Sequence, residues 1–313
     1  MGCFNDERVR EEKYRRMFGC YKYMILAILV IMAAGCKKKP DPIVITPDVK
    51  KTHLQRNHIY GDVKYIHTKT FYLAEDSIMV EDTANIAKIL KRRKADITSM
   101  QQYTSDGLLL KYVKLGPKKD TLLKRDYHYN DQALATRWEE YDSTGVMVTR
   151  GKYLYDRNKF LCGEQVFNGD SIAIAFAYNT DGIGNITSST QSMGDYTLHT
   201  ENKYNPDGQV YKIIEYEPNG RVFKTVKIEY DNYGDEVNRC VYKAGNQMIE
   251  YTYNQYSQDG KQIKTIYEDK IHHLKETHYY FDHDRYCNWQ TEVLVSGNQI
   301  VSIRKRQIIY YQN

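Results

Sequence analysis

The sequence predicts an all-β fold, an antiparallel hairpin repeat array that forms one extended or spiralling single sheet, with a short N-terminal helix. Three observations predict it. Tyr followed by Asp or Asn recurs at a nearly regular step along most of the 313 residues. Turn sequences rich in Gly, Asn and Asp alternate with short runs of strand formers. Tyr, whose ring packs while its hydroxyl stays in water, outnumbers the other aromatics, with 30 Tyr against 8 Phe and 2 Trp.

The recurring pair sets the length of the repeat. Its steps are 26, 23, 26, 26, 23 and 28 residues, and its copies begin at Tyr129, Tyr155, Tyr178, Tyr204, Tyr230, Tyr253 and, with Phe in place of Tyr, Phe281. A period in this range indicates a repeat architecture, in which stacked units bury a face that no unit buries alone.

Residues 204–231 show how one unit forms two strands. The segment opens with a turn that holds Pro206 and Gly208, and a strand follows. Asn219-Gly220 is a strong hairpin signal, and the second strand ends at Tyr230. The other units carry comparable turns, so residues 101–313 predict a repeat domain of roughly sixteen strands of ordinary length.

Residues 59–100 are predicted to lead into the repeats. One long strand or a strand pair covers 62–74, and Asp82-Thr83 caps a short helix over 84–94. The basic residues 91–94 suit the negative end of the helix dipole. A solvated helix end and a patch for headgroups or polyanions are the two interpretations of that basic run.

The first 35 residues predict export. Residues 24–34 are an uninterrupted apolar run with the length of a signal-peptide core. The segment Ala33-Ala34-Gly35-Cys36 that follows resembles the lipobox of bacterial lipoproteins, in which the chain is cut before the Cys and the Cys is lipidated. The resemblance implies a signal peptide over 1–35 and lipidation of Cys36. An uncleaved anchor and a plain signal peptide are the alternatives, and the start codon stays open between Met1 and Met17.

Residues 36–58 are predicted to be a flexible tether, because they combine a basic triplet with several Pro. The whole chain carries a formal net charge of +5, and residues 1–35 hold six of the 45 basic and four of the 40 acidic residues. The rest is therefore close to balance, which gives no electrostatic argument for a nucleic-acid partner. The expected location is the cell envelope, lipid-anchored at the outer membrane, with the periplasmic or surface face undetermined.

Three cysteines follow Cys36, namely Cys162, Cys240 and Cys287. An odd number in an exported chain leaves at least one thiol outside any disulfide, and we expect three packed thiols. Their spacing is not that of a zinc site.

The repeat resembles the YD repeats of the RHS family, and most closely its short lipoprotein branch. The matching residues are Tyr155-Asp156, Tyr178-Asn179 with Gly184-Asn185, Tyr230-Asp231-Asn232-Tyr233-Gly234, and Phe281-Asp282 leading to Cys287-Asn288-Trp289. The resemblance covers about two thirds of the chain and implies an elongated body of antiparallel hairpins with a surface for carbohydrate or partner binding. The chain has too few repeats to enclose a cargo, and Cys287 replaces an expected Gly, which predicts a distorted turn.

Catalytic and metal-binding signals are weak. His278, Asp282 and Asp284 share one face if their strand continues, and imidazole and carboxylate groups bind zinc. Asp is also an ordinary turn residue, so we expect no metal and no cofactor. The chain has no nucleophile elbow, phosphate-binding loop or zinc-protease motif, and no catalytic residues are predicted.

Aromatic residues on successive predicted strands are the candidate ligand-face aromatics: Tyr251, Tyr253, Tyr279, Phe281 and Trp289. Exposed, they would stack on sugar rings or accept a partner; buried, they would hold a thin sheet together. An open array would also leave two sheet edges for an added strand.

These features predict a lipid-anchored cell-envelope protein in which a non-catalytic β-repeat module binds partners or serves as a scaffold. The alternative is a carbohydrate-binding or glycan-processing surface lipoprotein. The expected partners are the membrane, through the lipid anchor, and envelope proteins or glycans.

Overall fold

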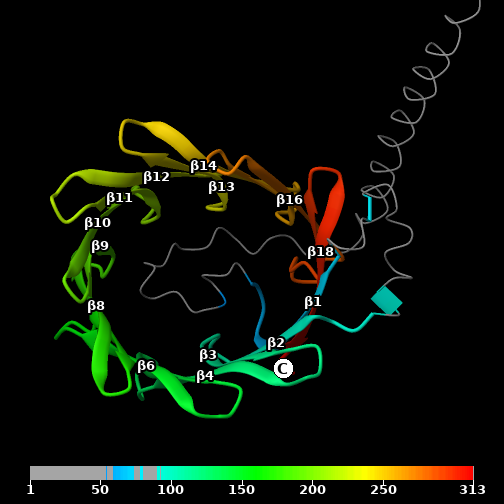
Figure 1. The fold of residues 1–313 in the computed structure, drawn as a ribbon, viewed down its shortest axis with the longest axis horizontal. Helices are drawn as coiled ribbons and strands as arrows, with labels where there is room; N and C mark the ends of the chain where they lie inside the picture. Colours follow the sequence, from blue (N-terminus) through cyan, green and yellow to red (C-terminus); the bar gives the residue numbers. More distant parts are fainter. Residues whose placement is uncertain (1–53, 55–58, 74–77, 80–89, 92, 313) are drawn as a thin grey trace, which may run out of the picture. The chain divides into compact units, whose positions relative to one another are not determined.

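The structure is a computed structural model that describes residues 54, 59–73, 78–79, 90–91 and 93–312 (Figure 1). All of them belong to the second of two compact units, Lys39–Asn313. The predicted signal peptide, Cys36, most of the tether and most of the predicted helix over 84–94 lie outside the described residues. No helix within the described part of the chain is long and apolar enough to cross a membrane.

In the described part of the chain, eighteen antiparallel strands form one sheet that closes on itself as a barrel. The first nine are β1 (Val63–Tyr72), β2 (Ile97–Tyr103), β3 (Leu109–Leu115), β4 (Thr121–Tyr129), β5 (Ala135–Tyr141), β6 (Met147–Tyr155), β7 (Leu161–Asn168), β8 (Ser171–Thr180) and β9 (Ile186–Met193). The others are β10 (Tyr196–Tyr204), β11 (Val210–Tyr216), β12 (Val222–Tyr230), β13 (Glu236–Lys243), β14 (Gln247–Tyr256), β15 (Gln262–Asp269), β16 (Leu274–Phe281), β17 (Thr291–Ser296) and β18 (Gln299–Tyr310).

Strand β1 closes the barrel. Strands β2 to β18 are a series of hairpins, and since their number is odd, β2 and β18 run in the same direction. β1 is antiparallel to both, and its Thr68 lies opposite Ser99 of β2 and Arg306 of β18. The prediction of an extended or spiralling single sheet is therefore wrong, because the predicted lead-in strand pairs with both ends of the array and closes it.

No helical element is defined among the described residues, and of the predicted helix over 84–94 only residues 90–91 and 93–94 are described, so that prediction is not confirmed. The described parts of the β1–β2 connection lie outside the ring of strands (Figure 1). Leu73 and Ile78 of this connection pack against Val295, Ile300 and Ile303 of β17 and β18. The connection thereby covers apolar side chains on the outer face of the barrel.

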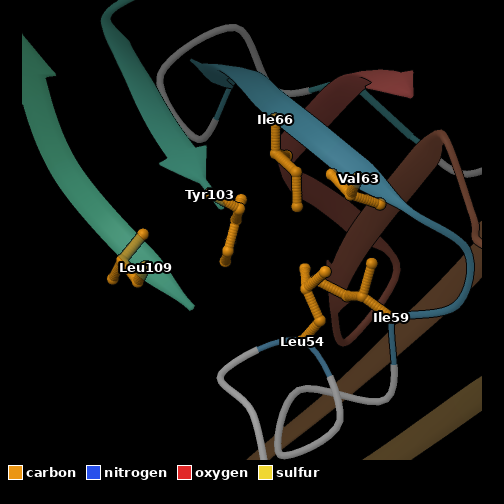
Figure 2. Packing of buried hydrophobic residues seen from close by; sticks show 6 residues of the cluster. All are labelled: Leu54, Ile59, Val63, Ile66, Tyr103 and Leu109. Carbon is orange, nitrogen blue, oxygen red and sulfur yellow. The ribbon is translucent and has the colours of Figure 1, made fainter. Parts of the chain in front are cut away.

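The described residues that precede β1, Leu54 and 59–62, lie on the inner side of the ring (Figure 1). Leu54 and Ile59 meet Val63 and Ile66 of β1 and Tyr103 and Leu109 of the next two strands, as Figure 2 shows. Ile66 and Tyr103 are each 1% exposed. Leu54 falls within the predicted tether, so part of that segment contributes to the core.

The opposite side of the wall is charged. Side chains alternate along a strand, and Tyr127 packs against the inner cluster, so its neighbours Asp126 and His128 lie on the outer face. There Lys124 Nζ lies 2.5 Å from Asp126 Oδ2, and His128 Nε2 lies 3.2 Å from Glu139 Oε2. The outer face of β4 and β5 is thus a polar surface.

One end of the barrel, here called the Tyr-Asp rim, is built from eight turns of one kind. In each, the side-chain oxygen of the first residue accepts a hydrogen bond from the backbone N–H four residues later, at 2.8–3.1 Å. Asp, Asn, Ser and Thr all provide such an acceptor. The first residues are Thr104, Asn130, Asp156, Asp181, Asn205, Asp231, Ser257 and Asp284. Their steps of 24–27 residues are more regular than those of Tyr, because β8 and β14 end at Thr180 and Tyr256 rather than at Tyr178 and Tyr253.

The strand-ending Tyr joins each hairpin to the strand before it. Tyr129 at the end of β4 donates its hydroxyl to the carbonyl of Leu109, the first residue of β3, at 2.7 Å. Tyr155 and Tyr230 repeat the contact with Ala135 and Val210. The Tyr therefore satisfies a carbonyl at the rim while its ring covers the inner face.

The fourth residue of each rim turn has a left-handed backbone. It is Gly in most turns, but Ala133, Lys159 and Cys287 adopt φ values of 60°, 65° and 67°. The turn at Cys287 keeps the usual hydrogen bonds, with the Cys287 N–H donating to the Asp284 carbonyl at 3.0 Å. The predicted distortion of this turn is therefore wrong. The hydrogen bonds are kept, and only the positive φ of Cys287 is unusual for a residue other than Gly.

Lys159→Gly is expected to raise the unfolding free energy by about 1 kcal/mol, because it removes a left-handed non-Gly residue. The melting temperature should rise by about 2–4 °C in calorimetry. The matched control is Gly145→Lys. Gly145 has a φ of 83°, and a Cβ added there would meet no other atom, so this variant should lower the melting temperature through the backbone angle alone. Equal melting temperatures for the Lys159 variant and the wild type would contradict this account of the turns.

Candidate functional site

A polar cavity of about 240 Å³ opens at the inner side of the Tyr-Asp rim. It lies where Tyr60, just before β1, meets β13 to β15, the connection from β16 to β17, and β18. It is lined by Tyr60, Asp235, Glu236, Asn254, Tyr256, Gly260, Gln262, Cys287, Asn288, Trp289 and Arg306.

Asn288 fixes Tyr60 as one wall of the cavity. Its Oδ1 accepts from the Tyr60 N–H at 2.9 Å, and its Nδ2 donates to the Tyr60 carbonyl at 2.8 Å and to the Tyr310 hydroxyl at 2.9 Å. Asn288 is 2% exposed, and its own N–H is held by Asp284. The backbone of Tyr60 is thereby bound as a strand partner would bind it, and burial raises the pKa of the Tyr60 hydroxyl to about 12.

Arg306 and Trp289 form a second wall. The guanidinium carbon of Arg306 lies 3.6 Å from the centre of the Trp289 ring, a close cation–π contact. Arg306 Nε donates to the Trp289 carbonyl at 3.0 Å. Burial lowers the pKa of Arg306 to about 10, so the side chain stays protonated at neutral pH.

The remaining lining is a network of amides and hydroxyls. Asn254 Nδ2 and the Tyr256 hydroxyl both donate to the Glu236 carbonyl, at 3.0 and 3.2 Å. Gln262 Nε2 donates to Asn254 Oδ1 at 3.3 Å. The Glu236 carboxylate pairs with Arg239, with contacts of 2.9 and 2.6 Å, so its charge is neutralised within the wall.

Glu292, on the strand that follows Trp289, is a buried carboxylate. Glu292 is 1% exposed; its Oε1 accepts from His278 Nδ1 at 2.6 Å and from Arg304 Nη2, while its Oε2 has no hydrogen-bond partner among the described residues. Burial acts to raise the pKa of Glu292, but the two donated hydrogen bonds outweigh it, and the pKa lies below its usual value.

The three weak metal candidates do not come together. His278 pairs with Glu292, whereas Asp282 accepts from the Thr291 hydroxyl at 2.5 Å. Asp284 instead opens its rim turn, where it accepts the N–H groups of the turn. The described chain contains no cluster of three His, Cys, Asp or Glu side chains arranged to hold a metal ion.

The candidate aromatics divide between the two faces of the wall. Tyr279 packs against Val293 and the outer cluster and stacks on Phe281 with ring centres 6.4 Å apart. Tyr251 and Tyr253 lie on the same face of β14, where Tyr251 donates to Asn238 at 3.1 Å. Trp289 alone lines the inner cavity. Strand β15 lies between the aromatic residues of β14 and those of β16. On β15, Ile266 is paired with Tyr253 and Lys264 is paired with Tyr279, so these aromatic residues do not form a continuous ladder.

Of the five candidate aromatics, Trp289 lines this cavity, whereas Tyr60, Asn288 and Arg306 are not among the residues that the sequence pattern singles out. One signal was present: the connection from β16 to β17 covers residues 282–290 and is longer than the five-residue turns of the other repeats. The extra residues carry Trp289 into the cavity and place His283 Nε2 2.8 Å from the Gln262 carbonyl. An irregular repeat therefore marked the site, although its partners lie far away in the sequence.

The opposite rim, formed by the other hairpin turns, gathers exposed apolar side chains. They belong to several successive hairpins, with Val146, Phe223 and Ile271 each at least half exposed. Others at this rim are Leu122, Met147, Val148, Ile172, Met193, Tyr196, Val222 and Leu274. Exposed apolar groups gathered in this way are typical of an interaction surface.

Replacing Glu292 by Gln is expected to lower the unfolding free energy at neutral pH by about 2–3 kcal/mol. The change removes the buried partner of His278 and Arg304, and the value sits at the low end for a broken buried pair because Arg304 is 43% exposed. Urea unfolding would measure it, with the outer-face Glu229→Gln as the control.

Comparison of wild type with Glu292→Gln also predicts a difference in the pH dependence of stability. The folded-state pKa of Glu292 is depressed, so its contribution is present above the unfolded value of about 4.5 and disappears as pH falls through the folded pKa. Wild type should therefore lose unfolding free energy below about pH 4.5 more steeply than Glu292→Gln does. Parallel pH profiles would show that Glu292 is not held as a paired carboxylate.

No known protein family matches the chain, and no curated protein does. Among solved structures, the chain is similar to a porin-like protein from Bacteroides uniformis, with 10% identity, a TM-score of 0.41, and coverage of 79% of this chain and 96% of that one. A porin-like protein from Bacteroides vulgatus matches with 8% identity and a TM-score of 0.29 over 69% and 93% of the two chains.

The Photorhabdus luminescens Tc holotoxin pore is a third similar structure, with 11% identity and a TM-score of 0.34. The match covers 65% of this chain and only 14% of that chain, so this chain spans a small part of the toxin chain's length. The likeness in all three cases is one of β-rich fold.

Proposed function

We propose that the protein is a lipid-anchored cell-envelope protein, attached at the outer membrane through Cys36, whose closed barrel is a non-catalytic binding module. The observation that carries the proposal is the rim cavity. It combines a half-buried cation, amides, hydroxyls and an indole ring around one small space, the usual composition of a specific ligand site.

The polar outer face supports attachment by lipid. Ion pairs such as Lys124 with Asp126 lie on the outer surface of the wall, where contact with hydrocarbon would be costly. Acyl chains on Cys36 would hold the protein at the membrane without that contact, and two or more chains make such an anchor stable.

A carbohydrate-binding role is the second candidate, and the cavity favours it too. Trp289 and Tyr256 offer ring surfaces, while Gln262 and Tyr60 offer polar groups for hydroxyls. In the scaffold role, the exposed apolar residues of the opposite rim would contact another envelope protein.

Cys36→Ala is expected to abolish acyl labelling and to release the protein from the membrane fraction, because the thiol is the proposed attachment point. Metabolic labelling with a fatty-acid analogue, followed by fractionation, measures both effects. Cys162→Ala, which changes a half-buried thiol within the barrel, is the matched control and should stay labelled and membrane-bound. Unchanged membrane association of the Cys36 variant would refute the lipid anchor.

The binding role is tested by opening the wall of the cavity. Asn288→Ala removes the three hydrogen bonds that hold Tyr60 and Tyr310, so it should abolish binding of small polar molecules. Saturation-transfer NMR with the full-length protein in detergent micelles, against a panel of monosaccharides, sugar acids and amino acids, reports binding.

Asn298→Ala, at an exposed turn of the opposite rim, is the matched control and should bind as wild type does. Circular dichroism checks that both variants are folded. A panel in which wild type gives no signal, or in which folded Asn288→Ala keeps every signal, would count against the cavity as the binding site.

A further inference from the structure

The guanidinium in the rim cavity indicates the class of ligand. Arg306 is a permanent cation lining the cavity, and no carboxylate of the described residues makes an ion pair with it. Its side-chain contacts among the described residues are the Trp289 ring and the Trp289 carbonyl. The carboxylates of Asp284 and Glu292 act on Arg306 only at longer range, so a ligand that brings one negative charge into direct contact with it would be stabilised there.

The geometry of Arg306 favours a carboxylate. Nε is committed to the Trp289 carbonyl, and stacking at 3.6 Å fixes the plane of the guanidinium. Both Nη groups are left without a hydrogen-bond partner among the described residues. Two parallel N–H donors in a fixed plane match the two oxygens of a carboxylate.

The carboxylate of Asp235 limits the negative charge that the ligand can carry. Asp235 also lines the cavity and is 5% exposed. Its negative charge would oppose a phosphate, which carries more than one charge at neutral pH, more strongly than it would oppose a single carboxylate. The cavity therefore suits a monoanion.

The other open polar groups suit hydroxyls. Gln262 Nε2 is occupied by Asn254 and Thr265, which leaves Gln262 Oε1 as an acceptor without a partner among the described residues. Tyr60 also lines the cavity, and its hydroxyl makes no hydrogen bond to the described residues. The volume of about 240 Å³ lies below the usual range for drug-sized ligands, so it accommodates one small ring.

From this arrangement we infer that the cavity binds a sugar acid, a single hydroxylated ring with one carboxylate held by Arg306 and hydroxyls facing Gln262 and Tyr60. This inference rests on the proposed function as a binding module and specifies its ligand. It differs from the aromatic-face hypothesis, because the recognition comes from one half-buried guanidinium rather than from a row of rings.

Calorimetric titration of the full-length protein in detergent micelles tests the inference. The probes are glucuronate and galacturonate, their neutral parents glucose and galactose, acetate, and glucose 6-phosphate. Either uronate should bind at least about tenfold more tightly than its neutral parent, since hydrogen bonds to charged groups are the stronger ones. Acetate should bind weakly because it lacks the hydroxyls, and the phosphate should bind less tightly than the uronate.

Three variants of β18 locate the effect. Arg306→Gln should weaken uronate binding by about tenfold to a hundredfold and leave the neutral sugars unchanged. Arg306→Lys keeps the charge but not the fork, so it should fall between. Lys305→Gln removes the same charge from the outer face one residue away and should bind as wild type does. The comparison of uronate with its parent on wild type needs no variant, so a poorly folded Arg306 variant does not remove the test.

Equal affinities of wild type for uronates and neutral sugars would overturn the sugar-acid assignment, and so would tighter binding of glucose 6-phosphate. Absence of uronate binding would overturn it as well. These outcomes are separate from failure of the binding module, which would require that no member of the wider NMR panel binds in a way that Asn288→Ala abolishes.

Discussion

The pairing of β1 with both β2 and β18 is the constraint on which the rest of the structure depends. Seventeen hairpin-linked strands leave two parallel-running ends, and one strand antiparallel to both completes an even-numbered ring. Without β1, both ends would present unpaired backbone groups, the feature that promotes aggregation of open sheets. Closure also creates the inner face, so the Tyr-Asp rim becomes a ring with an interior and the chain before β1 enters that interior.

The local rules of the repeat could be predicted from the sequence, because they are short-range. Asp156 binding the N–H of Phe160 and Gly145 adopting φ 83° follow from residue chemistry within one turn. The all-β character and the hairpins were therefore found. The strand ends follow less directly from the pattern. Tyr253 carries the same pair signature as Tyr230, yet β14 continues to Tyr256. The turn that Ser257 opens decides where this strand ends.

Closure and the cavity could not be predicted in this way. β1 lies over 200 residues from β18 in the chain, and periodicity says nothing about whether such distant ends meet. The contact of Tyr60 with Asn288 has the same character, with a separation of 228 residues. The sequence pattern singles out Trp289 for its aromatic ring. In the structure that ring stacks on Arg306, which belongs to β18, a strand whose sequence carries no site signal. Long-range contacts specify the site, while local pattern specifies only the frame that holds it.

The docking of Tyr60 has a mechanical consequence. Any force transmitted along the chain from its N-terminal side reaches Tyr60 and then β1 before it reaches another strand. At Tyr60 it meets the paired hydrogen bonds of Asn288, and at β1 it is divided between two ladders instead of one. A strand at the edge of an open sheet could be peeled from a single neighbour, whereas β1 must lose both neighbours together. The closing strand is thus also the point where the barrel is best suited to resist a pull.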